Sequence, residues 1–137
     1  MQMNKKLVFI SLPLSGRKEE DILEDIRKAK KAYLTINNED ICDIAFINNH
    51  ERGKTAVEYE RFLASEEGCN WVEPMRMSVW YLGIAMQNLA DCDAAIFYGD
   101  WKNARGCRIE RMVCQEYDIP VIELHSAPGR VYIDIDI

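Results

Sequence analysis

The stretch CDAAIFYGDWKNARGCRIERMVCQEY, from Cys92 to Tyr117, decides the fold of this 137-residue chain. Its apolar residues 94–98 predict a short buried strand, Gly99–Asn103 predicts a turn, and a helix is expected to begin at about Ala104–Gly106. Binding sites of α/β proteins occur at such strand–turn–helix steps, because the carboxyl end of a parallel strand meets the positive end of a helix dipole there.

Gly106 and Glu110 are four residues apart, so they share one face of the predicted helix. Helical side chains lean toward the N-terminus, and Glu110 is therefore expected to reach over the glycine toward the mouth of a cleft. A second interpretation stays open, because acidic residues are favoured near helix N-termini by the dipole and glycine permits close helix–sheet packing.

The composition, 48% hydrophobic and 29% charged, is that of an ordinary globular protein, and we expect a single domain over residues 1–137. A net charge of −6 argues against a nucleic-acid polymer or a membrane surface as partner. The same net charge does not exclude a small phosphorylated ligand, which needs only one or two cations in a local loop. No apolar run approaches the roughly 18–20 residues of a membrane span, and the apolar run after Lys6 is too short for a signal peptide. We therefore expect a cytoplasmic protein.

The five cysteines form no CxxC pair and no zinc-type spacing, so we expect no metal and no cofactor. Cys107 alone lies where a helix N-terminus lowers a thiol pKa. The two histidines, His50 and His125, fall in unrelated segments. A cysteine nucleophile is therefore the weaker hypothesis.

The remaining periodicity alternates strands with helices, and this alternation predicts a parallel sheet with right-handed crossovers. We expect a three-layer Rossmann/flavodoxin-like α/β fold whose five-stranded parallel sheet has the order 2-1-3-4-5. The other predicted elements are strand Lys6–Ser11, a helix from Lys18–Asp21, strand Ile41–Ile47, helix Thr55–Ser65, helix Met75–Leu89, strand Ile119–Leu124, a turn at His125–Gly129 and edge strand Val131–Ile137.

The loop Ser11–Arg17 combines two hydroxyls, a glycine, a cation and a following helix N-terminus, which together suit an anion. It is neither a P-loop nor a GxGxxG motif, and an ordinary Pro/Gly turn is the alternative. The strand order 2-1-3-4-5 places this loop beside Gly99–Glu110 at the switch point between the first and third strands. A nucleotide-sized ligand is therefore expected there, with Asp100, Trp101, Asn103 and Arg105 on the rim.

Four segments resemble an uncharacterised bacterial and phage domain family grouped with the nucleoside 2-deoxyribosyltransferases and the nucleoside-monophosphate N-glycosidases. They are FISLPLSGR (9–17), WYLG (80–83), ADCDA (90–94) and GDWKNARGCRIE (99–110). The resemblance covers nearly the whole chain, and its last segment is the most specific.

The resemblance implies that Glu110 attacks the anomeric carbon of a deoxyribosyl group. It also implies a small-molecule nucleoside or nucleotide as the substrate and a homodimer or larger assembly. The substrate-binding residues expected on the two grounds together are Ser11, Pro13, Ser15, Gly16, Arg17, Trp80, Asp100, Trp101, Arg105 and Gly106.

The chain departs from these enzymes in one respect: they carry an aspartate on the helix before the third strand, whereas residues 74–90 contain no acidic residue. Asp93 begins the third strand at its N-terminal end, which predicts a position across the sheet from the crevice. Three explanations stay open: an acid from elsewhere (Asp100 or a neighbouring subunit), a slow reaction, or a site that only binds. Accordingly, the hypotheses are N-glycosidic bond cleavage or exchange, a nucleotide-binding or sensing module, and a purely structural subunit.

Overall fold

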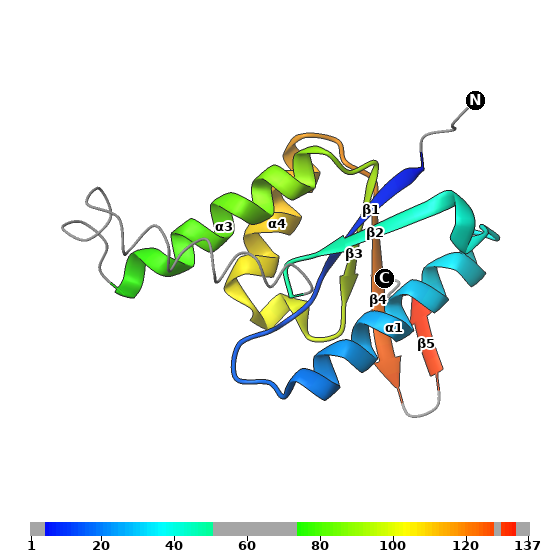
Figure 1. Cartoon of the computed structure of the whole chain (residues 1–137), viewed down its shortest axis with the longest axis horizontal. Coiled ribbons are helices and arrows are strands. Elements are labelled where there is room, and N and C mark those ends of the chain that lie inside the picture. Colours follow the sequence, from blue (N-terminus) through cyan, green and yellow to red (C-terminus); the bar gives the residue numbers. More distant parts are fainter. Residues whose placement is uncertain (1–4, 51–73, 128–129, 134–137) are drawn as a thin grey trace.

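The computed structural model describes residues 5–50, 74–127 and 130–133 of the chain. Its strands form one sheet in the order β2-β1-β3-β4-β5 (Figure 1). The elements are β1 (Lys6–Ser11), α1 (Glu19–Ile36), the 3-10 turn η1 (Ile41–Asp43), β2 (Ile44–Asn48), α3 (Pro74–Ala90), β3 (Ala94–Tyr98), η2 (Trp101–Asn103), α4 (Arg105–Glu116), β4 (Val121–Ala127) and β5 (Arg130–Ile133).

The predicted strand order is confirmed, but the all-parallel sheet is wrong at its edge. β5 pairs antiparallel with β4, whereas β1, β2, β3 and β4 are parallel. Only two residues separate Ala127 from Arg130, and so short a connection joins antiparallel strands only, since a parallel pair needs a crossover. The predicted turn His125–Gly129 is likewise corrected, because His125 and Ala127 belong to β4.

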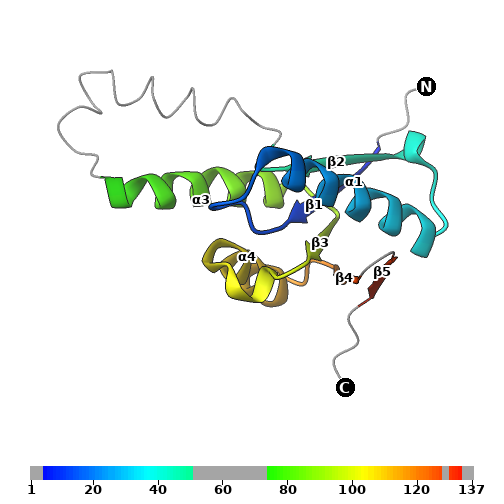
Figure 2. The ribbon, with the colours of Figure 1, turned by 90° about the horizontal axis from the view of Figure 1, so that it is seen from below.

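Apolar residues alternate across β1 and β3 and form a core on each face of the sheet. Val8 and Ile10 pack with Ile26 and Tyr33 of α1 on one face. Phe9 and Phe97 pack on the other face with residues of α3 and α4 such as Leu89 and Cys114. Figure 2 shows α1 and α4 on opposite sides of the strands. The chain therefore has the three layers that its sequence predicts.

The bounds of β1 and β3 agree with the prediction, whereas β2 begins three residues later, at Ile44, and β4 runs over Val121–Ala127 in place of the predicted Ile119–Leu124. Residues 41–43 form the turn η1, in which the Asp40 side chain accepts a hydrogen bond of 2.8 Å from the backbone N–H of Cys42. The predicted helix Thr55–Ser65 lies outside the described residues. Within the described ranges no helix is long and apolar enough to cross a bilayer.

Candidate functional site

Glu110 of α4 and Ser11 of β1 meet at the carboxyl end of the sheet, although 99 positions separate them. The Ser11 hydroxyl donates a hydrogen bond of 2.7 Å to Glu110 Oε1, and the Glu110 side chain is only 3% exposed. Ser11 is the last residue of β1 and pairs in register with Phe97 of β3. The predicted convergence of the first strand and the fourth helix at the switch point is therefore present.

Asn49 is a third member of this site, and the sequence analysis did not single it out. It follows β2 directly, and its Nδ2 lies 3.4 Å from Glu110 Oε2. Its Oδ1 is buried and accepts no hydrogen bond from the residues that the structure describes. The signal that finds it is the strand order itself: β2 neighbours β1, so the residue after β2 comes beside the residue that ends β1.

Burial governs the acidity of Glu110. Loss of solvent raises the pKa of its carboxyl from 4.5 to about 7, while the hydrogen bonds from Ser11 and Asn49 act in the opposite direction. Among the described residues no cation lies within ion-pair distance of this carboxyl. The group therefore changes its charge near neutral pH, the property required of an acid, base or nucleophile that works there.

The two simpler explanations for Gly106 and Glu110 do not fit the structure. No acidic residue lies in the first turn of α4, and Glu110 is buried one turn further on, so attraction to the helix dipole does not account for it. A Cβ added to Gly106 would meet no atom of the described residues within 4 Å, so packing against them does not require glycine at that position.

The Ser11–Arg17 loop forms a tight turn beside this carboxyl. Gly16 has a φ of +73°, a conformation that favours glycine, and both Ser15 and Gly16 are exposed. The Arg17 guanidinium donates to the Pro13 carbonyl at 2.9 Å and pairs with Asp25 at 2.5 Å. Arg17 thus links the loop to α1. The sequence predicted that its guanidinium would instead bind the phosphate of a ligand.

Two other expected rim residues have clear positions. Trp101 is 7% exposed and packs on Phe97 with ring centroids 5.2 Å apart, so it is a core residue, which corrects its expected place on the rim. Arg105 begins α4 and is exposed. Trp80 lies in α3, but its side chain falls outside the described residues.

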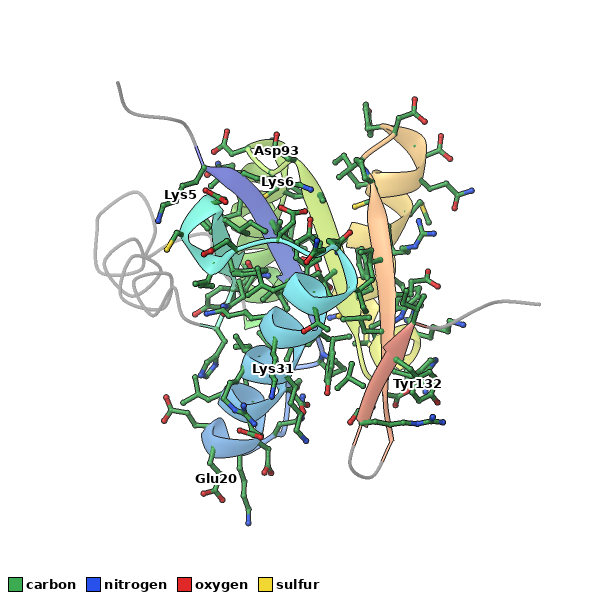
Figure 3. All side chains as sticks on the ribbon, turned by 90° about the vertical axis from the view of Figure 1, so that its right-hand side faces the viewer. Lys5, Lys6, Glu20, Lys31, Asp93 and Tyr132 are labelled. Carbon is green, nitrogen blue, oxygen red and sulfur yellow. The ribbon has the colours of Figure 1, made fainter. Side chains whose placement is uncertain are left out.

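Of the two aspartates considered as replacements for the missing acid, Asp93 lies away from the site and Asp100 lies at the surface. Asp93 Oδ2 accepts a hydrogen bond of 2.9 Å from the backbone N–H of Leu7, at the opposite end of the strands, as expected (Figure 3). Asp100 is exposed and accepts a hydrogen bond of 2.6 Å from Asn103.

A cysteine nucleophile is not supported. Burial raises the pKa of the Cys107 thiol to about 11, so little thiolate is present at neutral pH. In the described parts of the chain, no three His, Cys, Asp or Glu side chains gather in a way that could hold a metal ion.

No protein-family model matches the chain, and a comparison with curated proteins finds no significant match. The resemblance to nucleoside 2-deoxyribosyltransferases therefore stays a prediction from the four segments named above.

Proposed function

We propose that this protein cleaves or exchanges the N-glycosidic bond of a (deoxy)nucleoside or its 5′-monophosphate, with Glu110 as the nucleophile. The observation that carries the proposal is the buried Glu110 carboxyl, which Ser11 holds at the switch point of the sheet. Ligands of open α/β sheets bind outside the carboxyl ends of the strands at this point. The resemblance of segment 99–110 supports the choice of reaction.

The two carboxyl oxygens have different surroundings, which suits nucleophilic attack. Oε1 is held at 2.7 Å by Ser11, whereas Oε2 has only the longer contact of 3.4 Å with Asn49. In the proposed reaction Oε2 forms a bond to the anomeric carbon as the C–N bond breaks, and the departing base takes up a proton. Water or a second base then attacks the same carbon and releases Glu110.

A nucleotide-binding or sensing module without turnover is the second candidate, and a specific observation favours it. Residues 74–90 contain no carboxylate, and no second carboxyl is hydrogen-bonded to Glu110 within the described ranges. The leaving base needs a proton donor. If neither Asp100 nor a second subunit provides one, the site binds a nucleotide without cleaving it.

Base release decides between the two candidates. Purified protein is incubated with ribo- and deoxynucleosides and their 5′-monophosphates, and free base is measured by chromatography. We expect release by the wild type, loss of release in Glu110→Gln with binding retained, and no change in Glu116→Gln, an exposed position on the same helix.

The pH profile supplies a further test. The rate should rise about tenfold per pH unit below the pKa of Glu110 and level off above about 7. No free base, together with ligand-dependent stabilisation of about 2.7 kcal/mol at one hundred times Kd, would favour the binding module. If the protein releases no base and none of these ligands stabilises it, both candidates are refuted.

The proposal includes a cytoplasmic location and a homodimer or larger assembly. The mass of the protein in solution, measured by light scattering, tests the assembly. A monomer that still releases base would show that one subunit completes the site.

A further inference from the structure

A groove of about 380 Å³ lies between α1 and β5, away from Glu110. α1 packs on the face of the sheet opposite to α3 and α4, so the groove and the Glu110 site are separate. Figure 3 shows Lys31 on α1 and Tyr132 on β5, the two elements that enclose it. The groove is lined by Arg27, Lys28, Lys31, Ala32, Thr35, Arg130 and Val131.

Among the residues that the structure describes, the groove carries more positive than negative charge. Arg27 is paired with Glu24 through two hydrogen bonds. Among the described residues, no carboxylate lies within ion-pair distance of Lys28, Lys31 or Arg130. Glu24 also attracts Lys28, so among the described residues one carboxylate faces the four cations that line the groove, in a chain of net charge −6.

The groove also contains features that would orient a small ligand. The Arg130 guanidinium lies 5.1 Å from the centre of the Tyr132 ring, which restricts its orientation. Ala32 and Val131 add an apolar surface and pack against the core. The volume falls in the range of about 300–1,000 Å³ that is typical of small-molecule sites. Arginine and lysine together suit phosphate, which accepts bidentate and single hydrogen bonds.

We propose that this groove binds the diphosphate group of a nucleotide-sized molecule. The excess of positive charge along the groove suits a diphosphate, and the apolar surface accommodates an attached organic group. Nucleoside diphosphates and inorganic pyrophosphate share this chemistry, so the test separates them. The inference does not depend on the proposed reaction at Glu110.

Isothermal titration of the full chain with inorganic pyrophosphate, ADP, AMP and adenosine tests the proposal. In the groove, whose share of the binding is the part that Arg130→Glu removes, we expect one molecule of ADP or pyrophosphate, weaker binding of AMP, and none of adenosine. Tighter binding of ADP than of pyrophosphate would assign the groove to a nucleotide, and the reverse would assign it to the inorganic anion. Affinity should fall as salt is raised.

Matched charge-reversal variants locate the site. Lys31→Glu and Arg130→Glu should each weaken binding by roughly tenfold or more. Lys5→Glu changes the net charge equally but lies far from the groove (Figure 3), and it should bind as the wild type does. Lys5, Lys31 and Arg130 are all exposed, and circular dichroism tests whether each variant folds.

Three results would overturn the proposal. The first is the absence of heat with every diphosphate at millimolar concentration. The second is equal weakening by Lys5→Glu and Lys31→Glu, which would indicate general attraction to surface charge. The third is binding of an acidic peptide but of no diphosphate, which would make the groove a protein-docking surface.

Discussion

Replacement of Glu110 by glutamine should stabilise the protein at pH 8 and have much less effect at pH 5. Burial raises the pKa of this carboxyl from 4.5 to about 7. Between those values the folded protein keeps the proton that the unfolded chain loses, so the free energy of unfolding of the wild type falls as pH rises. Above about pH 7 both states are ionised and the penalty is constant. Glutamine keeps the shape, accepts the Ser11 hydrogen bond and carries no charge.

The size of the effect follows from the change in pKa. Each pKa unit corresponds to about 1.4 kcal/mol, so ionisation of Glu110 destabilises the fold by about 3 kcal/mol at high pH. The part of this penalty that develops between pH 5 and pH 8 is about 2–3 kcal/mol. For a domain of this length that corresponds to a difference in Tm of roughly 5–10 °C.

Urea unfolding of the wild type and of Glu110→Gln at pH 5, 6, 7 and 8 measures the effect. The quantity of interest is the difference in unfolding free energy between the two proteins, because the titration of all other groups cancels in it. Glu116→Gln, exposed on the same helix, is the control and should give a constant difference. A Glu110→Gln difference that is equally constant from pH 5 to pH 8 would refute the reasoning, since the carboxyl would then titrate alike in both states.

The remaining predictions concern the partners of the carboxyl and the loop beside it. Ser11→Ala removes a hydrogen bond that lowers the pKa of Glu110, so the midpoint of the pH dependence should move upward in the same unfolding series. Asn49→Ala should move it in the same direction but less, because its contact of 3.4 Å is longer than the 2.7 Å bond from Ser11. Asp25→Ala should cost about 1 kcal/mol or less of stability and should free Arg17. If Arg17 then reaches the ligand, the affinity for a nucleoside 5′-monophosphate should rise while that for the nucleoside stays constant; equal affinities before and after would exclude a phosphate-binding role.

The parallel part of the fold was predictable because its signals are local. β1 and β3 have the predicted bounds, since a continuous apolar run marks a strand buried on both faces. That β1 and β3 lie next to each other follows from the strand order 2-1-3-4-5, which is common in sheets of this kind. The direction of β5 was not predictable from its alternating residues, which have the same pattern in a parallel or an antiparallel edge strand. The length of the connection before it decides the direction, and β4 extends further than its apolar run indicated.

The candidate site was predictable only in part, because several of its contacts involve residues that lie in no recognisable sequence motif. Glu110 was predicted from its spacing to Gly106 and from the resemblance of segment 99–110 to the nucleoside 2-deoxyribosyltransferases. Ser11 was predicted from its position at the end of β1. Asn49 lies in a polar loop that has no motif. The pairing of Arg17 with Asp25 depends on how the loop returns onto α1, which spacing does not reveal.

The partners of Glu110 indicate what this site is built to do. A buried carboxyl that served only stability would be paired with a cation, which would lower its pKa and fix its charge. Among the described residues, a hydroxyl and an amide hold the Glu110 carboxyl and no cation pairs with it, and burial raises its pKa to about 7. Natural proteins accept such a local loss of stability mainly at functional sites. The arrangement therefore favours a group that gains and loses charge, or forms a bond, over one that only fills the core.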